Sequence, residues 1–115
     1  MTDLKQRGLL DDTLVVWGGE FGRTPYAELK EGSKPGRDHH HTGFSLFLAG
    51  GGVKGGRVVG ESDAIGAFPK ANPKTPQDVL ATVYRHLGVD TRAEYSNNGR
   101  PVPVLPSGKP IDELF

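Results

Sequence analysis

The fold is decided by residues 9–22, which read LLDDTLVVWGGEFG. Residues 13–17 are apolar after their first threonine and rich in β-branched types, a pattern typical of a strand that is buried on both faces. Glu20 follows at the carboxyl end of this strand, in a glycine-rich turn. Because open α/β sheets bind ligands just outside the carboxyl ends of their strands, we expect an α/β fold with a functional carboxylate at Glu20.

The composition excludes several classes of protein. The chain has 14 Lys and Arg residues against 14 Asp and Glu residues, without a long run of like charge, so we expect no nucleic-acid partner. It has no cysteine, which excludes disulfides and thiolate catalysis by these residues. No apolar run is long enough to predict a transmembrane segment. With 17 Gly, 9 Pro and 35% hydrophobic residues, the chain has little material for a core, which favours part of a larger enzyme.

Residues 38–41 read DHHH and are four consecutive potential metal ligands. Side chains alternate along an extended segment, so either His39 and His41 or Asp38 and His40 can converge on one ion. Imidazole together with carboxylate favours zinc or manganese over calcium or magnesium. The alternative is a surface histidine tract that binds metal only adventitiously.

Arg23 and Arg37 are the candidate anion-binding residues. Each flanks a candidate ligand, and a guanidinium group can bind a sulfate or phosphate ester through two parallel hydrogen bonds. The alternative for either residue is a solvated side chain.

Residues 50–55 read GGGVKG and match the dinucleotide-binding pattern G-x-G-x-x-G, but that pattern requires a helix to follow. Residues 57–59 instead predict a short strand, so we interpret the glycines as the turn of a hairpin that joins them to residues 46–48. An anion-binding nest of backbone amides is the remaining alternative.

A helix is predicted to begin at residues 75–78, which read TPQD. Threonine suits the cap, proline the first helical position and aspartate the positive end of the helix dipole. Apolar residues recur at helical spacing as far as Leu87, so we assign this helix to packing and His86 to a structural role. Residues 96–115 alternate prolines with apolar residues and predict an extended, proline-rich tail.

Three longer motifs carry a resemblance to a known family. They are WGGEFGRTP at residues 17–25, GRDH at 36–39 and LAGGGVKGG at 48–56, and they resemble the domain-of-unknown-function family 1501, in the sulfatase-like branch of the alkaline phosphatase and sulfatase superfamily. On the superfamily pattern Glu20 falls on a metal-binding Asp, whereas Phe21 replaces a ligating His or Asn.

The late metal-binding histidine of the superfamily falls on His39, when it is counted back from the strand that follows. His41 is the rival position, because the tripeptide His-Thr-Gly at residues 41–43 imitates alkaline phosphatases. We favour His39, because an offset of two residues displaces a ligand by roughly 6.6 Å along a strand.

The resemblance implies that residues 1–115 are the C-terminal portion of one alkaline-phosphatase-like, three-layer α/β domain, whose nucleophile lies in a preceding half. It implies a metal-dependent hydrolase of sulfate or phosphate esters, exported to the periplasm or cell envelope, with this segment inactive alone. The alternative is a non-catalytic binding or envelope-associated protein on a hydrolase scaffold. We also expect self-association through an exposed edge of the strand at residues 13–17. The implied metal-binding residues are Glu20, His39, Asp38 and His41, and the anion-binding residues are Arg23 and Arg37.

Overall fold

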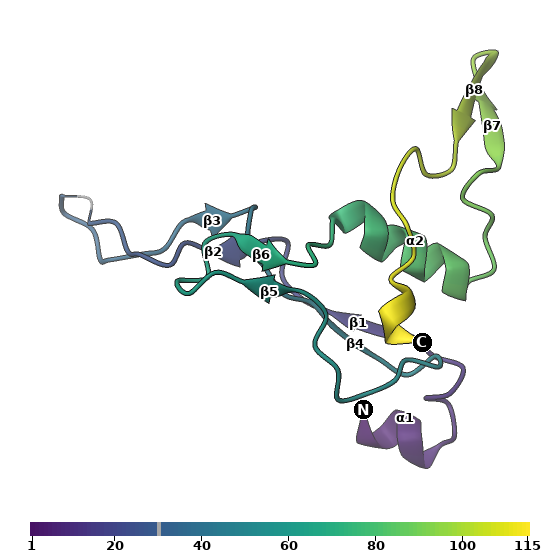
Figure 1. Ribbon diagram of the computed structural model, residues 1–115, viewed down its shortest axis with the longest axis horizontal. Coiled ribbons are helices and arrows are strands. Elements are labelled where there is room, and N and C mark those ends of the chain that lie inside the picture. The colour runs from purple at the N-terminus through teal and green to yellow at the C-terminus, as the bar shows by residue number, and fades with distance from the viewer. Residues whose placement is uncertain (30) are drawn as a thin grey trace. The chain divides into compact units, whose positions relative to one another are not determined.

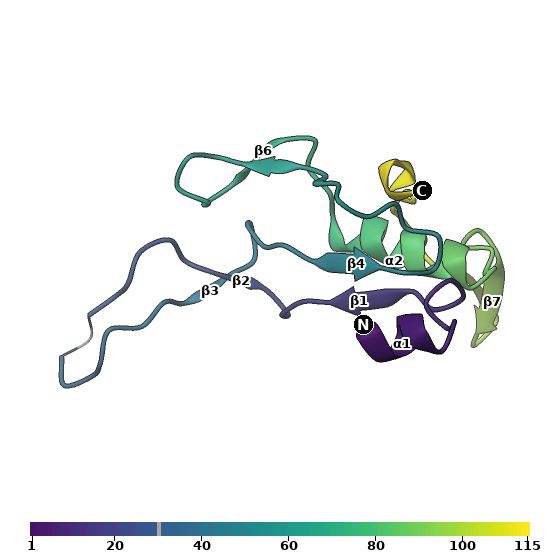
Figure 2. The same ribbon diagram turned by 90° about the horizontal axis from the view of Figure 1, so that it is seen from below.

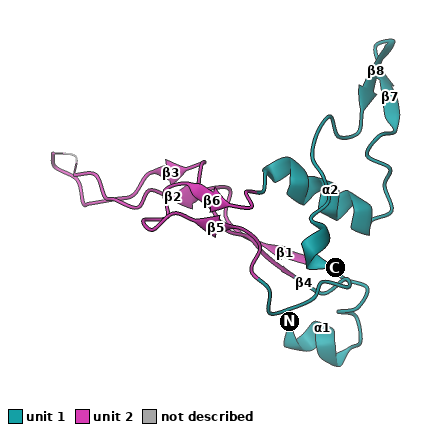
Figure 3. Ribbon diagram, viewed as in Figure 1, with its two compact units in different colours: residues 1–14, 49–57, 74–115 teal, residues 15–48, 58–73 magenta. Residues whose placement is uncertain are grey.

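The computed structural model of the chain describes residues 1–29 and 31–115. They form two compact units (Figure 3): residues 1–14, 49–57 and 74–115 make unit 1, and residues 15–48 and 58–73 make unit 2. Helices and small two-stranded sheets are mixed along the chain, which confirms the α/β class. Among the described residues, no helix combines the length and apolar character needed to cross a membrane.

Unit 1 contains most of the helical structure (Figure 1). The helix start predicted at residues 75–78 is confirmed, and the structure adds a capping box: Thr75 Oγ1 accepts a hydrogen bond from the Asp78 amide (3.2 Å), and Asp78 Oδ2 accepts one from the Thr75 amide (2.8 Å). The elements of this unit are α1 (Thr2–Gln6), α2 (Pro76–His86), β7 (Glu94–Asn97), β8 (Arg100–Pro103) and the 3₁₀ helix η1 (Asp112–Leu114).

The small core of unit 1 forms where the C-terminal segment packs on α2. The Thr82 side chain is fully buried, and its hydroxyl donates to the Asp78 carbonyl (2.7 Å) and accepts from the Ile111 amide (2.9 Å). Ile111 is only 5% exposed, whereas Leu87, which we expected on the packing face, is 66% exposed. The segment around Ile111 therefore supplies apolar cover that helical periodicity alone did not predict.

The predicted extended tail is wrong in its first part, because β7 and β8 form an antiparallel hairpin. Asn98 and Gly99 occupy its turn with φ values of 51° and 78°. Two-residue hairpins favour an Asn-Gly pair with positive φ. This pair therefore indicated a hairpin, whereas the prolines that follow indicated an extended tail.

Unit 2 is built from short strands. The strand predicted at residues 13–17 forms as β1 (Val15–Trp17) and pairs with β4 (Phe47–Ala49), as Figure 2 shows. Its predicted burial on both faces is wrong: Trp17 is 74% exposed and Val16 43% exposed. Within the described residues β1 has β4 as its one strand partner, so its other edge pairs with no strand. The remaining strands are β2 (Gly22–Arg23), β3 (His39–His40), β5 (Glu61–Ser62) and β6 (Pro69–Ala71).

The predicted glycine-rich hairpin is also wrong. Residues 57–59 form no strand, and β4 pairs with β1 instead. Gly50, Gly51 and Gly52 all have positive φ (72°, 56° and 83°), which lets the chain turn sharply away from the end of β4. The next element is β5 rather than a helix, which confirms that the dinucleotide-binding pattern is coincidental.

Candidate functional site

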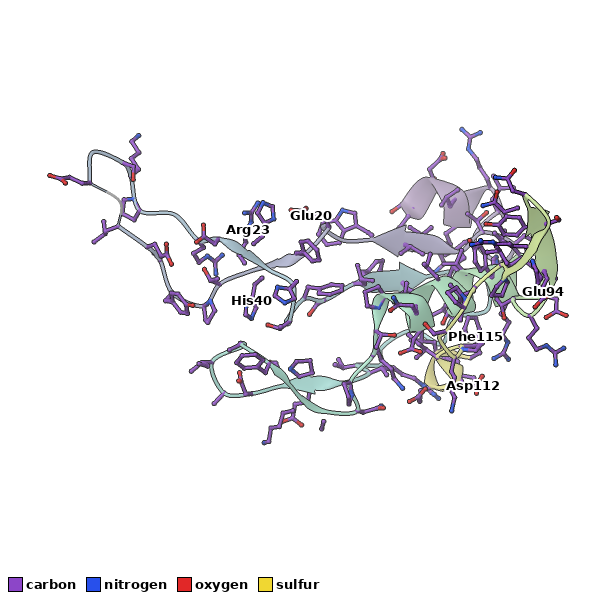
Figure 4. All side chains as sticks on the ribbon, turned by 90° about the horizontal axis from the view of Figure 1, so that it is seen from above. Glu20, Arg23, His40, Glu94, Asp112 and Phe115 are labelled. Carbon is purple, nitrogen blue, oxygen red and sulfur yellow. The ribbon has the colours of Figure 1, made fainter. Side chains whose placement is uncertain are left out.

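The candidate site lies on the ribbon formed by β2 and β3 in unit 2. The two strands are antiparallel, with Gly22 opposite His40 and Arg23 opposite His39. Because side chains alternate along a strand, Arg23 and His39 share one face and His40 takes the other. Figure 4 shows Glu20 and Arg23 on one side of the ribbon and His40 on the opposite side.

Two features fix the register of this ribbon. Thr24, only 8% exposed, accepts from the Asp38 amide through Oγ1 (3.0 Å), and its own amide donates to the Asp38 carbonyl (2.9 Å). Gly22 passes so close to Gly43 that a Cβ at Gly22 would lie 1.9 Å from the Gly43 carbonyl oxygen. Both contacts would be lost if either strand moved by one residue.

Glu20 and His39 meet at the edge of the ribbon. Glu20 Oε1 lies 2.7 Å from His39 Nδ1, and the two side chains are 61% and 60% exposed, respectively. A hydrogen bond between the Glu20 carboxyl and its own backbone lowers the pKa of this carboxyl below its usual value. The charges of His39 and Arg23 act in the same direction. The carboxylate is therefore ionised at neutral pH and is available as an acceptor.

Phe21 lies among the histidine rings of the same face. Its ring is edge-on to His39 (centroids 6.4 Å apart, 83° between planes) and to His41 (6.3 Å, 77°). It also meets Phe44 edge-on at 6.4 Å and remains 46% exposed. An aromatic side chain thus occupies the position between the two histidines that share this face.

His40 has a structural role on the opposite face. Its Nε2 lies 2.5 Å from the Ala67 carbonyl oxygen, and its ring is 6.2 Å from the ring of Phe68. The Thr42 hydroxyl lies 3.2 Å from both His40 Nε2 and the Ala67 oxygen. These contacts fasten β3 to the turn at residues 63–68.

The structure brings together only some of the predicted site residues. Glu20 and His39 are in direct contact, Arg23 lies opposite His39, and His41 is linked to them through Phe21. Asp38 contributes backbone hydrogen bonds to Thr24, and Arg37, unlike Arg23, is not among the charges that act on Glu20. In the part of the chain that the structure describes, no group of three or more His, Asp or Glu side chains is arranged to hold a metal ion.

The donor chemistry of the Glu20 and His39 pair nevertheless fits a zinc-like ion. Two bonds of about 2.1 Å at a tetrahedral angle separate their donor atoms by about 3.4 Å. The observed separation is 2.7 Å between exposed side chains, so a small rotation would suffice to accommodate an ion. Sequence reasoning missed Phe21 and Thr24 as organising residues, although alternation places Phe21 on the face of Arg23.

Comparisons with known proteins identify a family but no characterised relative. The family model described as "Protein of unknown function (DUF1501)" matches residues 1–115. Neither the curated proteins nor the solved structures gave a match. Because the family model spans every residue of the sequence, the chain belongs to the DUF1501 family.

Proposed function

We propose that the face carrying Glu20, Arg23 and His39 is part of a metal-dependent site for the hydrolysis of sulfate or phosphate esters. The observation that carries this proposal is the 2.7 Å contact between Glu20 and His39, with Arg23 directly across the ribbon from His39. A carboxylate, an imidazole and a guanidinium are thereby gathered at the ends of two strands. An alkaline-phosphatase-like domain, exported from the cytoplasm, is the setting that the superfamily resemblance suggests.

Glu20 and His39 are the residues that would hold zinc or manganese, with His41 and Asp38 as the further donors that the resemblance implies. A bound divalent ion supplies Lewis-acid polarisation of an ester oxygen. Arg23 would bind the other sulfate or phosphate oxygens, because its planar donors match a tetrahedral anion. The positive charge of Arg23 also helps to lower the pKa of the Glu20 carboxyl, although the backbone hydrogen bond at Glu20 lowers it most.

The nucleophile is proposed to come from outside these residues. Thr42 carries the hydroxyl nearest in sequence to His41, but it is hydrogen-bonded with His40 and Ala67 on the opposite side of the ribbon. Ester cleavage requires a positioned nucleophile, so we expect this chain alone not to turn over aryl sulfates or aryl phosphates.

A second candidate is a non-catalytic binding face on a hydrolase scaffold. Phe21 favours it, because an exposed aromatic ring stands where the superfamily pattern has a ligand, and it cannot coordinate a metal. Exposed aromatic rings next to polar groups are common in binding surfaces. The two candidates differ in whether the face binds metal.

Titration calorimetry with zinc tests the metal-binding part of the proposal. We expect one zinc ion per chain, with affinity at least tenfold lower in His39→Ala and unchanged in the matched control His86→Ala, since His86 belongs to unit 1. Inorganic phosphate should then bind the zinc-loaded protein more weakly in Arg23→Ala than in the control Arg100→Ala. Equal zinc affinity in His39→Ala and the unaltered chain would reject the metal site in favour of the binding face.

A further inference from the structure

We infer that the outer edge of β7 (Glu94–Asn97) is an interaction surface for a second copy of this chain. Two β7 strands pair antiparallel about Tyr95 and join two hairpins into one four-stranded sheet. The inference is independent of the proposed function, because β7 belongs to unit 1 and the candidate site to unit 2. It also concerns a different strand from β1, whose edge in unit 2 is expected to self-associate.

The backbone groups of β7 alternate between its two edges. The Val104 amide donates to the Ala93 carbonyl oxygen (2.9 Å), which places the Ala93 carbonyl on the edge that faces β8 (Figure 1). In an antiparallel pair, every second residue exchanges hydrogen bonds with the strand opposite. Tyr95 therefore bonds to β8, whereas the backbone N–H and C=O groups of Glu94 and Ser96 point to the outer edge.

Two prolines close the corresponding edge of β8. Pro101 lies opposite Ser96 and Pro103 opposite Glu94, so the nitrogen atoms of both prolines face away from β7. Proline has no N–H to donate, and prolines on edge strands are one means by which proteins prevent strand pairing. β7 contains no proline, and all four of its residues are exposed. Within the described residues the sheet consists of these two strands, so its open edge is that of β7.

The sequence of β7 is complementary to itself in one antiparallel register. Pairing about Tyr95 sets Glu94 opposite Ser96 of the second copy and Ser96 opposite its Glu94, so both outward-facing residues of each strand exchange hydrogen bonds. The Ser96 hydroxyl can also donate to the facing Glu94 carboxylate. A shift of two residues one way would set Glu94 against Glu94, which is destabilising, and the other way would set it against Asn98, beyond the end of β7. Charge and hydrogen bonding thus favour a second copy in this register.

Tyr95 adds a side-chain contact at the centre of this pairing. It is 55% exposed in the single chain. In the proposed register it occupies the position between two hydrogen-bonded pairs, where the facing Cα atoms are about 4.5 Å apart. The two Tyr95 rings therefore meet across the symmetry axis, and cross-strand aromatic pairs stabilise antiparallel sheets. Because an isolated two-stranded hairpin is only marginally stable in water, the additional strands also stabilise each hairpin.

Hydrogen exchange of single amides in the unaltered chain tests the inference. The Tyr95 amide bonds within the hairpin and should be protected at every protein concentration. The Glu94 and Ser96 amides should exchange freely in dilute solution and become at least tenfold more protected as the concentration rises. A mixture of ¹³C-labelled and unlabelled chains should then show contacts between the Tyr95 rings of two copies. Glu94 and Ser96 amides that exchange at one rate up to the solubility limit would overturn the inference.

A proline substitution on β7 supplies the matched comparison. Ser96→Pro removes an outward N–H, as Pro101 does directly across the hairpin, and spares the hydrogen bonds between β7 and β8. Ser96→Ala keeps that N–H. Protection of the Glu94 amide should therefore depend on concentration in Ser96→Ala and not in Ser96→Pro, while quenching of Trp17, which reports on β1, should be equal in the two variants.

Concentration-dependent protection of Glu94 that persists in Ser96→Pro would reject pairing at β7. Loss of Tyr95 protection in Ser96→Pro would show that the proline disturbs the hairpin itself. In that case the labelled mixture of unaltered chains decides, since contacts between the Tyr95 rings support the pairing and their absence at high concentration rejects it.

Discussion

Arg23 lies directly opposite His39 in the antiparallel pair of β2 and β3, so a guanidinium and an imidazole leave the same face of the ribbon. The register that pairs them is fixed at Gly22 and Thr24, on either side of Arg23. Because side chains alternate with a period of two, a slip of one residue would place these groups on opposite faces. The placement of Arg23 and His39 on one face therefore depends on the backbone contacts at Gly22 and Thr24.

Gly22→Ala should disrupt this ribbon. A Cβ at Gly22 would lie 1.9 Å from the Gly43 carbonyl oxygen, and overpacking of this kind costs about 1–3 kcal/mol. Nuclear Overhauser contacts between β2 and β3 should weaken or vanish. Gly36→Ala is the matched control, since a Cβ there meets nothing within 4 Å, and it should preserve the contacts. Equal effects of the two substitutions would contradict the register.

Thr82→Val should destabilise unit 1. The substitution keeps the shape of the side chain but leaves the Ile111 amide without its buried acceptor, which costs about 1–3 kcal/mol in the free energy of unfolding. Thr82→Ser retains the hydroxyl and should lose less. Chemical denaturation of the three proteins measures this, and a valine variant as stable as the serine variant would show that the hydrogen bond does not matter.

Asp78 should make the stability of unit 1 depend on pH in the acid range. Backbone hydrogen bonds from Lys109 and then Thr75 lower the pKa of the Asp78 carboxyl below its usual 3.8. A carboxyl with a lowered pKa contributes stability above its unfolded-state pKa and loses that contribution as the pH falls through the folded-state value. Thermal unfolding should therefore shift to lower temperature below about pH 4, and less so in Asp78→Asn than in the control Asp11→Asn.

Trp17 reports on the predicted self-association through β1. It is the single tryptophan of the chain and is 74% exposed, so iodide should quench its fluorescence efficiently in dilute solution. An uncovered strand edge pairs readily with another chain, so quenching should fall as protein concentration rises, in step with the mass measured by ultracentrifugation. A monomer whose quenching is constant over the whole concentration range would refute self-association at this strand.

Features determined by neighbouring residues could be predicted from the sequence. The helix start at residues 75–78 was predicted from neighbouring residues, and α2 begins there with Thr75 as its cap. The alternation of His39, His40 and His41 likewise follows from strand geometry and correctly separates His40 from the other two. Residue spacing is sufficient to predict features whose contacts join residues close together in the sequence.

Features determined by distant residues could not be predicted. The apolar run at β1 predicted a strand correctly, but its burial depends on which elements cover it, and Trp17 is exposed. The glycines at residues 50–52 suggested a hairpin between the segments on either side of them. The strand before them, β4, instead pairs with β1, which lies about thirty residues earlier and cannot be inferred from the local pattern. At the candidate site, the contact of Glu20 with His39 was expected, whereas the nitrogen of His39 that meets Glu20 depends on how the side chain is oriented in the folded ribbon.

The central claim is that His39 and Glu20 belong to a zinc-binding face, and the X-ray absorption spectrum of the chain loaded with one equivalent of zinc tests it most directly. We predict nitrogen and oxygen donors at about 2.0–2.1 Å, with an imidazole scattering contribution that decreases in His39→Ala but persists in His86→Ala. A zinc spectrum that is identical in His39→Ala and the unaltered chain would contradict the account.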